Sequence, residues 1–266
     1  MATHPFTARV LVGRDDELAT LRAGVDAARS GRPNLALLVG QAGIGKTRLA
    51  DEAAFTAGAD GMRVLRGEAD ASWREPMELW RGVYRALGVD GVGDRLLPSE
   101  ERRWEHLESL TDALRSCGPV LVVLEDLHWA DPIALWVLGH LPRALGDAPV
   151  ALVATCRDDE PGLPRLDAVR RVARVVALGG LDLDAVRELA AAEATGSVDA
   201  VALHARTGGN PDPPRKGASH DVPSHHVARM DCGPGRERCG ACCDGRRAGA
   251  CGRDGARRGD LVDRVR

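Results

Sequence analysis

Residues Gly40 to Thr47 carry the clearest chemical signal in the chain, because they match the phosphate-binding pattern G-x-x-x-x-G-K-[ST] at every fixed position. Glycines let successive backbone N–H groups turn inward around phosphates, Lys46 can reach the β and γ oxygens, and the Thr47 hydroxyl can bind Mg²⁺. Lysine is rare here, since Lys46 and Lys216 are the only two. The pattern predicts a nucleoside triphosphate site whose loop residues are Gly40, Gln41, Ala42, Gly43, Ile44, Gly45, Lys46 and Thr47.

A second candidate is the acidic pair Glu125-Asp126, which directly follows the apolar run 120–124. Ligands of doubly wound sheets bind at the carboxyl ends of the strands, so we expect this pair beside the glycine loop. One acid could hold Mg²⁺, usually through water, and its neighbour could orient the attacking water. The predicted metal-binding residues are therefore Thr47, Glu125 and Asp126, and the two acids are also predicted to be catalytic.

Arg157 is the third predicted catalytic residue, because it stands just beyond the end of an expected strand. A planar cation suits the charge that develops on a transferring phosphate, so Arg157 could sense the γ-phosphate or act across a subunit contact. The alternative is a surface ion pair with Asp158 or Asp159, and the sequence leaves both interpretations open.

The elements that must position these residues alternate between strands and helices. Strands are expected at 34–39, 62–67, 120–124 and 149–155, and helices from 15 or 16 to about 30 and at 47–54, 76–87 and 100–116. Such alternation implies a parallel sheet with right-handed crossovers. Asp131 before Pro132 indicates a helix N-cap followed by proline at the first helical position. The expected fold class is α/β, a P-loop NTPase with a parallel β-sheet flanked by helices.

Composition divides the chain unequally. Residues 1–210 carry 24 Lys and Arg against 31 Asp and Glu, and are long enough for one sizeable core. Residues 211–266 carry 12 basic against 8 acidic residues and hold five of the seven cysteines, a composition that cannot bury enough apolar surface to fold alone. We therefore expect one folded body followed by a disordered C-terminal tail at 212–266.

The sequence favours a cytoplasmic protein. No stretch approaches the length of a membrane span, and the first residues lack a basic and then apolar export signal. Cys117 and Cys156 are expected to be reduced, small apolar residues rather than a disulfide pair. No membrane partner is expected.

Five landmarks occur in an order that resembles the AAA-like ATPase module of large ATP-binding LuxR-family transcriptional regulators and related STAND-type signalling ATPases. The resemblance covers about residues 9–211, which implies an N-terminal extension at 1–8 and an AAA-like P-loop ATPase domain at 9–211. The landmarks are Val12-Gly13-Arg14-Asp15-Asp16-Glu17-Leu18, the loop Gly40 to Thr47, Leu124-Glu125-Asp126-Leu127-His128-Trp129-Ala130-Asp131, Thr155-Cys156-Arg157-Asp158-Asp159-Glu160 and Thr207-Gly208-Gly209-Asn210-Pro211.

The resemblance implies a regulatory switch that binds ATP or ADP with Mg²⁺ and self-associates in a nucleotide-dependent way. It places Val12, Gly13 and Arg14 near the base or ribose of an adenine nucleotide. It assigns DNA binding to a C-terminal domain that the sequence does not show. The family usually has Asp where this chain has Glu125, which puts tight Mg²⁺ geometry and the hydrolysis rate in question. A second functional class stays open, a stand-alone interaction protein that binds nucleotide without turnover.

The tail after Pro211 departs from the family, and three interpretations of it differ in the chemistry they imply. Alanine codons of a GC-rich gene encode Pro, Arg and Gly in the other two frames, so we infer a truncated regulator whose tail is translated out of frame. A zinc site is the alternative, built on Cys239 and Cys242 with Cys232, Cys243, Cys251, His220, His225 and His226 nearby. A basic nucleic-acid-binding tail is disfavoured, because acids interrupt its charges and aromatic residues are missing.

Overall fold

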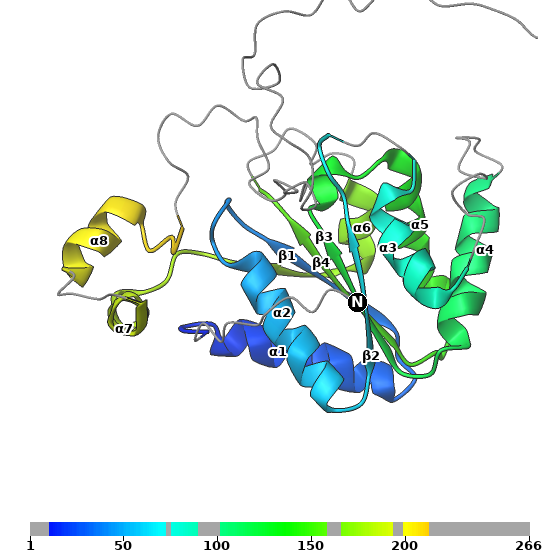
Figure 1. The fold of residues 1–266 in the computed structure, drawn as a ribbon, viewed down its shortest axis with the longest axis horizontal. Coiled ribbons are helices and arrows are strands. Elements are labelled where there is room, and N and C mark those ends of the chain that lie inside the picture. The colour runs from blue at the N-terminus through cyan, green and yellow to red at the C-terminus, as the bar shows by residue number, and fades with distance from the viewer. Residues whose placement is uncertain (1–10, 73–75, 90–101, 159–165, 194–198, 213–266) are drawn as a thin grey trace, which may run out of the picture. The chain divides into compact units, whose positions relative to one another are not determined.

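The structure is a computed structural model of the 266-residue chain, and it describes residues 11–72, 76–89, 102–158, 166–193 and 199–212 (Figure 1). The expectations for residues 1–8 and for the tail beyond Asp212 lie outside these residues. The zinc, out-of-frame and disorder hypotheses for the tail therefore stay predictions.

A five-stranded parallel sheet in the order β2-β3-β4-β1-β5 forms the centre of the fold. Its strands are β1 (Asn34–Val39), β2 (Arg63–Glu68), β3 (Val120–Glu125), β4 (Val150–Cys156) and β5 (Arg174–Ala177). All of β4 and all of β3 except Glu125 are buried, as expected for strands covered on both faces. This arrangement confirms the predicted parallel sheet of a P-loop NTPase.

Helices cover both faces of the sheet (Figure 1). They are α1 (Asp15–Arg29), α2 (Lys46–Ala59), α3 (Glu78–Leu87), α4 (Arg102–Arg115), α5 (Pro132–Ala144), α6 (Asp167–Val172), α7 (Leu183–Glu193) and α8 (Ala200–Thr207), with a short 3₁₀ turn η1 (Leu127–Trp129). Alternate residues of β3 point to opposite faces, so Leu121 and Val123 pack with α1 and α2 while Val122 and Leu124 pack with α3, α4 and α5.

The N-cap of α5 forms as the sequence predicts. The Asp131 carboxylate accepts hydrogen bonds from the backbone N–H groups of Ile133 and Ala134, at 2.9 and 3.0 Å. The same side chain accepts from the N–H of Met77 at 2.7 Å, so one carboxylate also ties the start of α3 to α5. Cys117 and Cys156 are free thiols, as expected.

A small third cluster joins the two ends of the described chain. Val12 packs there with Leu181, Ala185, Val186 and Ala200, which come from α7, α8 and the segment before α7. The sequence does not predict β5, α6, α7 or α8. Across the described ranges, no helix is both long enough and apolar enough to pass through a membrane.

Candidate nucleotide-binding site

The glycine loop lies between the end of β1 and the start of α2. Gly43 and Gly45 have φ angles of +76° and +102°, a left-handed region that side chains other than glycine rarely adopt. The Gly45 N-cap offers no side chain to the first turn of α2. The N–H groups at this helix end, together with the positive end of the helix dipole, thus form an anion-binding feature.

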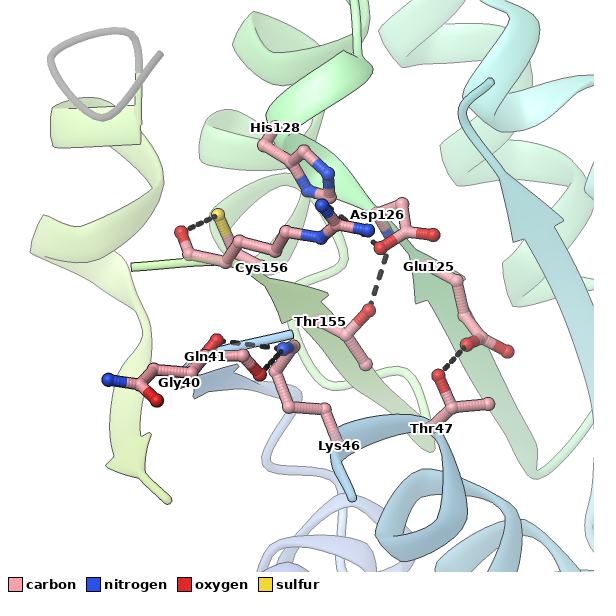
Figure 2. A network of polar contacts seen from close by, with 10 residues as sticks. Gly40, Gln41, Lys46, Thr47, Glu125, Asp126, His128, Thr155 and Cys156 are labelled. Atoms are coloured by element: carbon pink, nitrogen blue, oxygen red, sulfur yellow. Dashed lines mark hydrogen bonds and ion pairs between the residues drawn. The ribbon is translucent and has the colours of Figure 1, made fainter. Parts of the chain in front are cut away.

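The Lys46 side chain folds back over this loop (Figure 2). Its ammonium donates to the carbonyl oxygens of Gly40 at 2.7 Å and Gln41 at 2.8 Å. The residue is only 7% exposed, and this burial lowers the pKa of Lys46, while the nearby Asp126 carboxylate opposes the shift. The loop therefore holds a buried cation that is hydrogen-bonded to its own carbonyl oxygens.

Thr47 and Glu125 meet across the gap between α2 and β3 (Figure 2). The Thr47 hydroxyl donates to Oε2 of Glu125 at 2.6 Å. Because the hydroxyl hydrogen points to the carboxylate, the oxygen lone pairs stay available for a metal ion. Burial raises the pKa of Glu125, and the hydrogen bond from Thr47 partly offsets that rise. The Glu125 carboxylate therefore reaches Thr47 directly.

Asp126 adopts a left-handed backbone, with a φ of +57°. For a residue other than glycine this conformation costs about 1 kcal/mol, and the surrounding structure must hold it. The Asp126 N–H donates to Oγ1 of Thr155 on the neighbouring strand β4 at 3.0 Å, which supplies that support (Figure 2). The His128 ring approaches the Asp126 carboxylate, with 3.8 Å between Nδ1 and Oδ1.

Charge connects Asp126 to the other candidates. Burial raises the pKa of the Asp126 carboxyl, and the positive charges of Arg157 and then Lys46 oppose this rise. Arg157 also lowers the pKa of Lys46, as a neighbouring cation should. The structure therefore brings Arg157 within electrostatic reach of both residues. The role of Arg157 at the phosphate stays a prediction, and Asp159 of the alternative ion pair lies outside the described residues.

The Val12-Gly13-Arg14 element lies against the back of the loop. The Arg14 guanidinium donates to the carbonyl oxygens of Ile44 at 3.2 Å and Gly179 at 2.6 Å. A Cβ atom on Gly13 would stand 2.6 Å from the Cβ of Ala185, so only glycine fits. Arg14 is 6% exposed and satisfied by protein oxygens, so in this structure it fixes the loop's position. Its expected place near the base or ribose stays a prediction.

Three residues at the site escaped the sequence analysis. Asn210 is buried, and its side-chain amide donates to the carbonyl of Ala42 at 3.0 Å, which links the end of the described chain to the loop. Thr155 supports Asp126, and Arg66 of β2 approaches Glu125. Thr155 and Asn210 stand within family landmarks, so their positions were visible without their roles. An arginine on a strand carries no such signal.

The donor set fits Mg²⁺ bound together with phosphate. Within the described ranges, no group of three or more His, Cys, Asp or Glu residues is placed to enclose a metal. Magnesium commonly takes only one or two carboxylates and completes its shell with waters and nucleotide phosphates. Thr47, Glu125 and Asp126 beside an anion-binding loop offer that partial set.

Comparisons with known proteins agree with this geometry. The chain is 26% identical over 189 residues to an uncharacterised protein of Rhizobium meliloti (strain 1021), a match over 55% of this chain and 18% of that protein. The chain thus spans under a fifth of this relative's length.

Solved structures share the fold. Cdc6p of Pyrobaculum aerophilum aligns with a TM-score of 0.59 and 21% identity over 80% of this chain and 59% of its own. The Orc1 protein of Aeropyrum pernix, solved in complex with DNA, aligns with a TM-score of 0.55 and 22% identity over 76% and 57%. A family model described as an AAA ATPase domain matches residues 10–153, more than half of the chain. The chain belongs to the AAA ATPase domain family and carries its nucleotide-binding module.

Proposed function

We propose that this chain binds ATP or ADP with Mg²⁺ at the loop formed by residues 40–47 and uses the bound nucleotide as a regulatory state. The observation that carries the proposal is the hydrogen bond from Thr47 to Glu125 beside the loop that Lys46 covers. A hydroxyl already donating to a carboxylate leaves its lone pairs available to the metal that accompanies the phosphates.

The proposed roles follow from where each side chain lies. Lys46 exchanges its two carbonyl partners for phosphate oxygens, and Thr47 and Glu125 hold Mg²⁺ directly or through water. When bound, Mg²⁺ neutralises charge on the phosphates. Asp126, fixed through Thr155, orients a water molecule, and Arg157 contributes positive charge near the γ-phosphate.

Hydrolysis is proposed to be slow, as suits a switch. The Asp126 and Glu125 carboxylates both lie at the end of β3, but Glu125 is engaged by Thr47 and Arg66 while Asp126 faces Lys46 and Arg157. This division leaves Asp126 as the stronger candidate for the group that orients water. The finer proposal is that the module regulates transcription as part of a LuxR-family regulator and self-associates when it binds ATP. The ordered landmarks of the sequence support that proposal.

Single-turnover hydrolysis of radiolabelled ATP, with enzyme in excess over nucleotide, tests the proposal. We expect slow release of phosphate that requires Mg²⁺ and is lost in Asp126→Asn. Sedimentation of the same samples with ADP and ATP tests nucleotide-dependent self-association. Tight nucleotide binding without any phosphate release would favour the second class, an interaction protein that uses nucleotide as a structural ligand.

A further inference from the structure

Arg66 is a basic side chain held against the carboxylate that is proposed to bind the metal. Its Nη1 atom lies 3.6 Å from Oε1 of Glu125, while its Nη2 atom lies 2.7 Å from Oδ1 of Asp51 on α2. The other oxygen of Glu125 accepts the Thr47 hydrogen bond. Both carboxylate oxygens of Glu125 are therefore engaged, one by a hydroxyl and one by a cation.

The strand register explains why Arg66 reaches this place. Glu68 of β2 pairs with Glu125 of β3, and Arg66 stands two residues earlier on the same face of the sheet. Val123, the partner of Arg66 in the register, packs on the face that α2 covers. The alternation of side chains along the strands therefore places Arg66 on the same face of the sheet as Glu125.

A structural brace is a weaker explanation for this contact. The Arg66 side chain is 42% exposed, and partly exposed ion pairs contribute little to folding stability. A pocket of about 300 Å³ at the sheet edge borders Arg66 and Glu125, together with Glu68 and Glu78. The guanidinium therefore has room beside it and a second carboxylate, Asp51, that holds it when Glu125 is taken.

We propose that Arg66 is a positioning residue that competes with Mg²⁺ for the Glu125 carboxylate and so sets the Mg²⁺ concentration at which this chain binds nucleotide as a metal complex. The inference rests on the proposed function, because it needs Glu125 at the metal. In the metal-free chain Arg66 neutralises Glu125. When Mg²⁺ arrives with nucleotide, Arg66 gives up this contact and keeps its pair with Asp51.

The test measures Mg²⁺ dependence separately from nucleotide affinity. Binding of a fluorescent ADP analogue to the full 266-residue chain is measured first with EDTA and then with increasing Mg²⁺. The wild type and Arg66→Gln are compared. We expect the half-saturating Mg²⁺ concentration of Arg66→Gln to be about threefold to fivefold lower, the upper part of the range for a partly exposed ion pair. An equal or higher Mg²⁺ requirement overturns the inference.

Two further variants separate charge from structure. Arg63→Gln removes the same charge from the same strand, but Arg63 contacts the Ala86 carbonyl and Cys117 instead of Glu125, so its Mg²⁺ requirement should match the wild type. Arg66→Lys keeps the charge and should stay within about twofold of the wild type. If Arg66→Lys resembles Arg66→Gln, or Arg63→Gln lowers the requirement equally, competition by the Arg66 charge is wrong.

The two proposals fail differently. Absence of nucleotide binding by the folded wild type contradicts the proposed function. Nucleotide binding by the wild type with the same Mg²⁺ dependence in Arg66→Gln contradicts the role of Arg66 alone. Should Arg66→Gln not fold, Arg66→Met provides the same comparison, and Mn²⁺ followed by electron paramagnetic resonance reports metal binding directly.

Discussion

Replacing Lys46 by alanine should weaken nucleotide binding, but by less than the full free energy of a contact between lysine and phosphate. In the structure the ammonium makes hydrogen bonds of 2.7 and 2.8 Å to two loop carbonyls, and these must break before it reaches a nucleotide. A hydrogen bond to a charged group contributes about 1.5–3 kcal/mol. Because the exchange recovers part of that energy, we expect the lower half of this range, which corresponds to about tenfold to fortyfold in Kd.

The assay is equilibrium titration of a fluorescent ADP analogue at fixed Mg²⁺. Arg48→Ala is the matched control, because Arg48 lies two residues further along α2 and pairs with Glu52 on the same helix. The control should bind as the wild type does, and circular dichroism should show both variants folded. Equal dissociation constants for Lys46→Ala and Arg48→Ala would refute the assignment of Lys46 to the phosphates.

Four other predictions concern the two acids, their ionisation and the contact of Asn210 with the loop. Glu125→Gln combined with Asp126→Asn should lower single-turnover hydrolysis by about a hundredfold or more while nucleotide still binds, and undiminished phosphate release would remove both residues from the site. Burial raises the pKa of both carboxyls, so they become protonated at a higher pH than ordinary carboxyls do. As the pH falls, Mg²⁺-dependent nucleotide binding should therefore weaken at a correspondingly higher pH, whereas binding measured with EDTA serves as the comparison. A carboxyl whose pKa is higher in the folded than in the unfolded chain lowers the stability of the fold once the pH exceeds that folded pKa. Glu125→Gln should therefore raise the Tm of the nucleotide-free chain near neutral pH, and a lower Tm would contradict this. Asn210→Ala should raise Kd for nucleotide about threefold to tenfold by releasing the Ala42 carbonyl, whereas an unchanged Kd would show that Asn210 does not hold the loop.

The part of the fold around the glycine loop could be predicted because few other residue types or conformations are compatible with it. Gly43 and Gly45 are required by positive φ angles, and the apolar run before Glu125 could only be a buried strand in this setting. By contrast, β5 spans only Arg174–Ala177 and alternates exposed and buried positions weakly, so its pattern is too short to separate from a loop. It forms because β1 offers it an open edge, which is a tertiary effect.

The candidate site shows the same limit. Residue type and order identified Lys46, Thr47, Glu125 and Asp126, because phosphate and metal chemistry restricts what can stand there. The residues that contact and orient these four could not be identified in this way, because they come close only when the sheet has formed. Arg66 reaches Glu125 through strand register, and Asn210 reaches Ala42 from 168 positions along the chain. Only the folded arrangement reveals such contacts.

The most direct test of the central claim is calorimetric titration of the full chain with ADP and ATP, each with and without Mg²⁺, with GTP as a comparison. We predict one nucleotide per chain, micromolar affinity for the adenine nucleotides, tighter binding with Mg²⁺ and a matching rise in Tm. No binding heat and no rise in Tm at millimolar nucleotide, from a chain shown to be folded, would contradict the account.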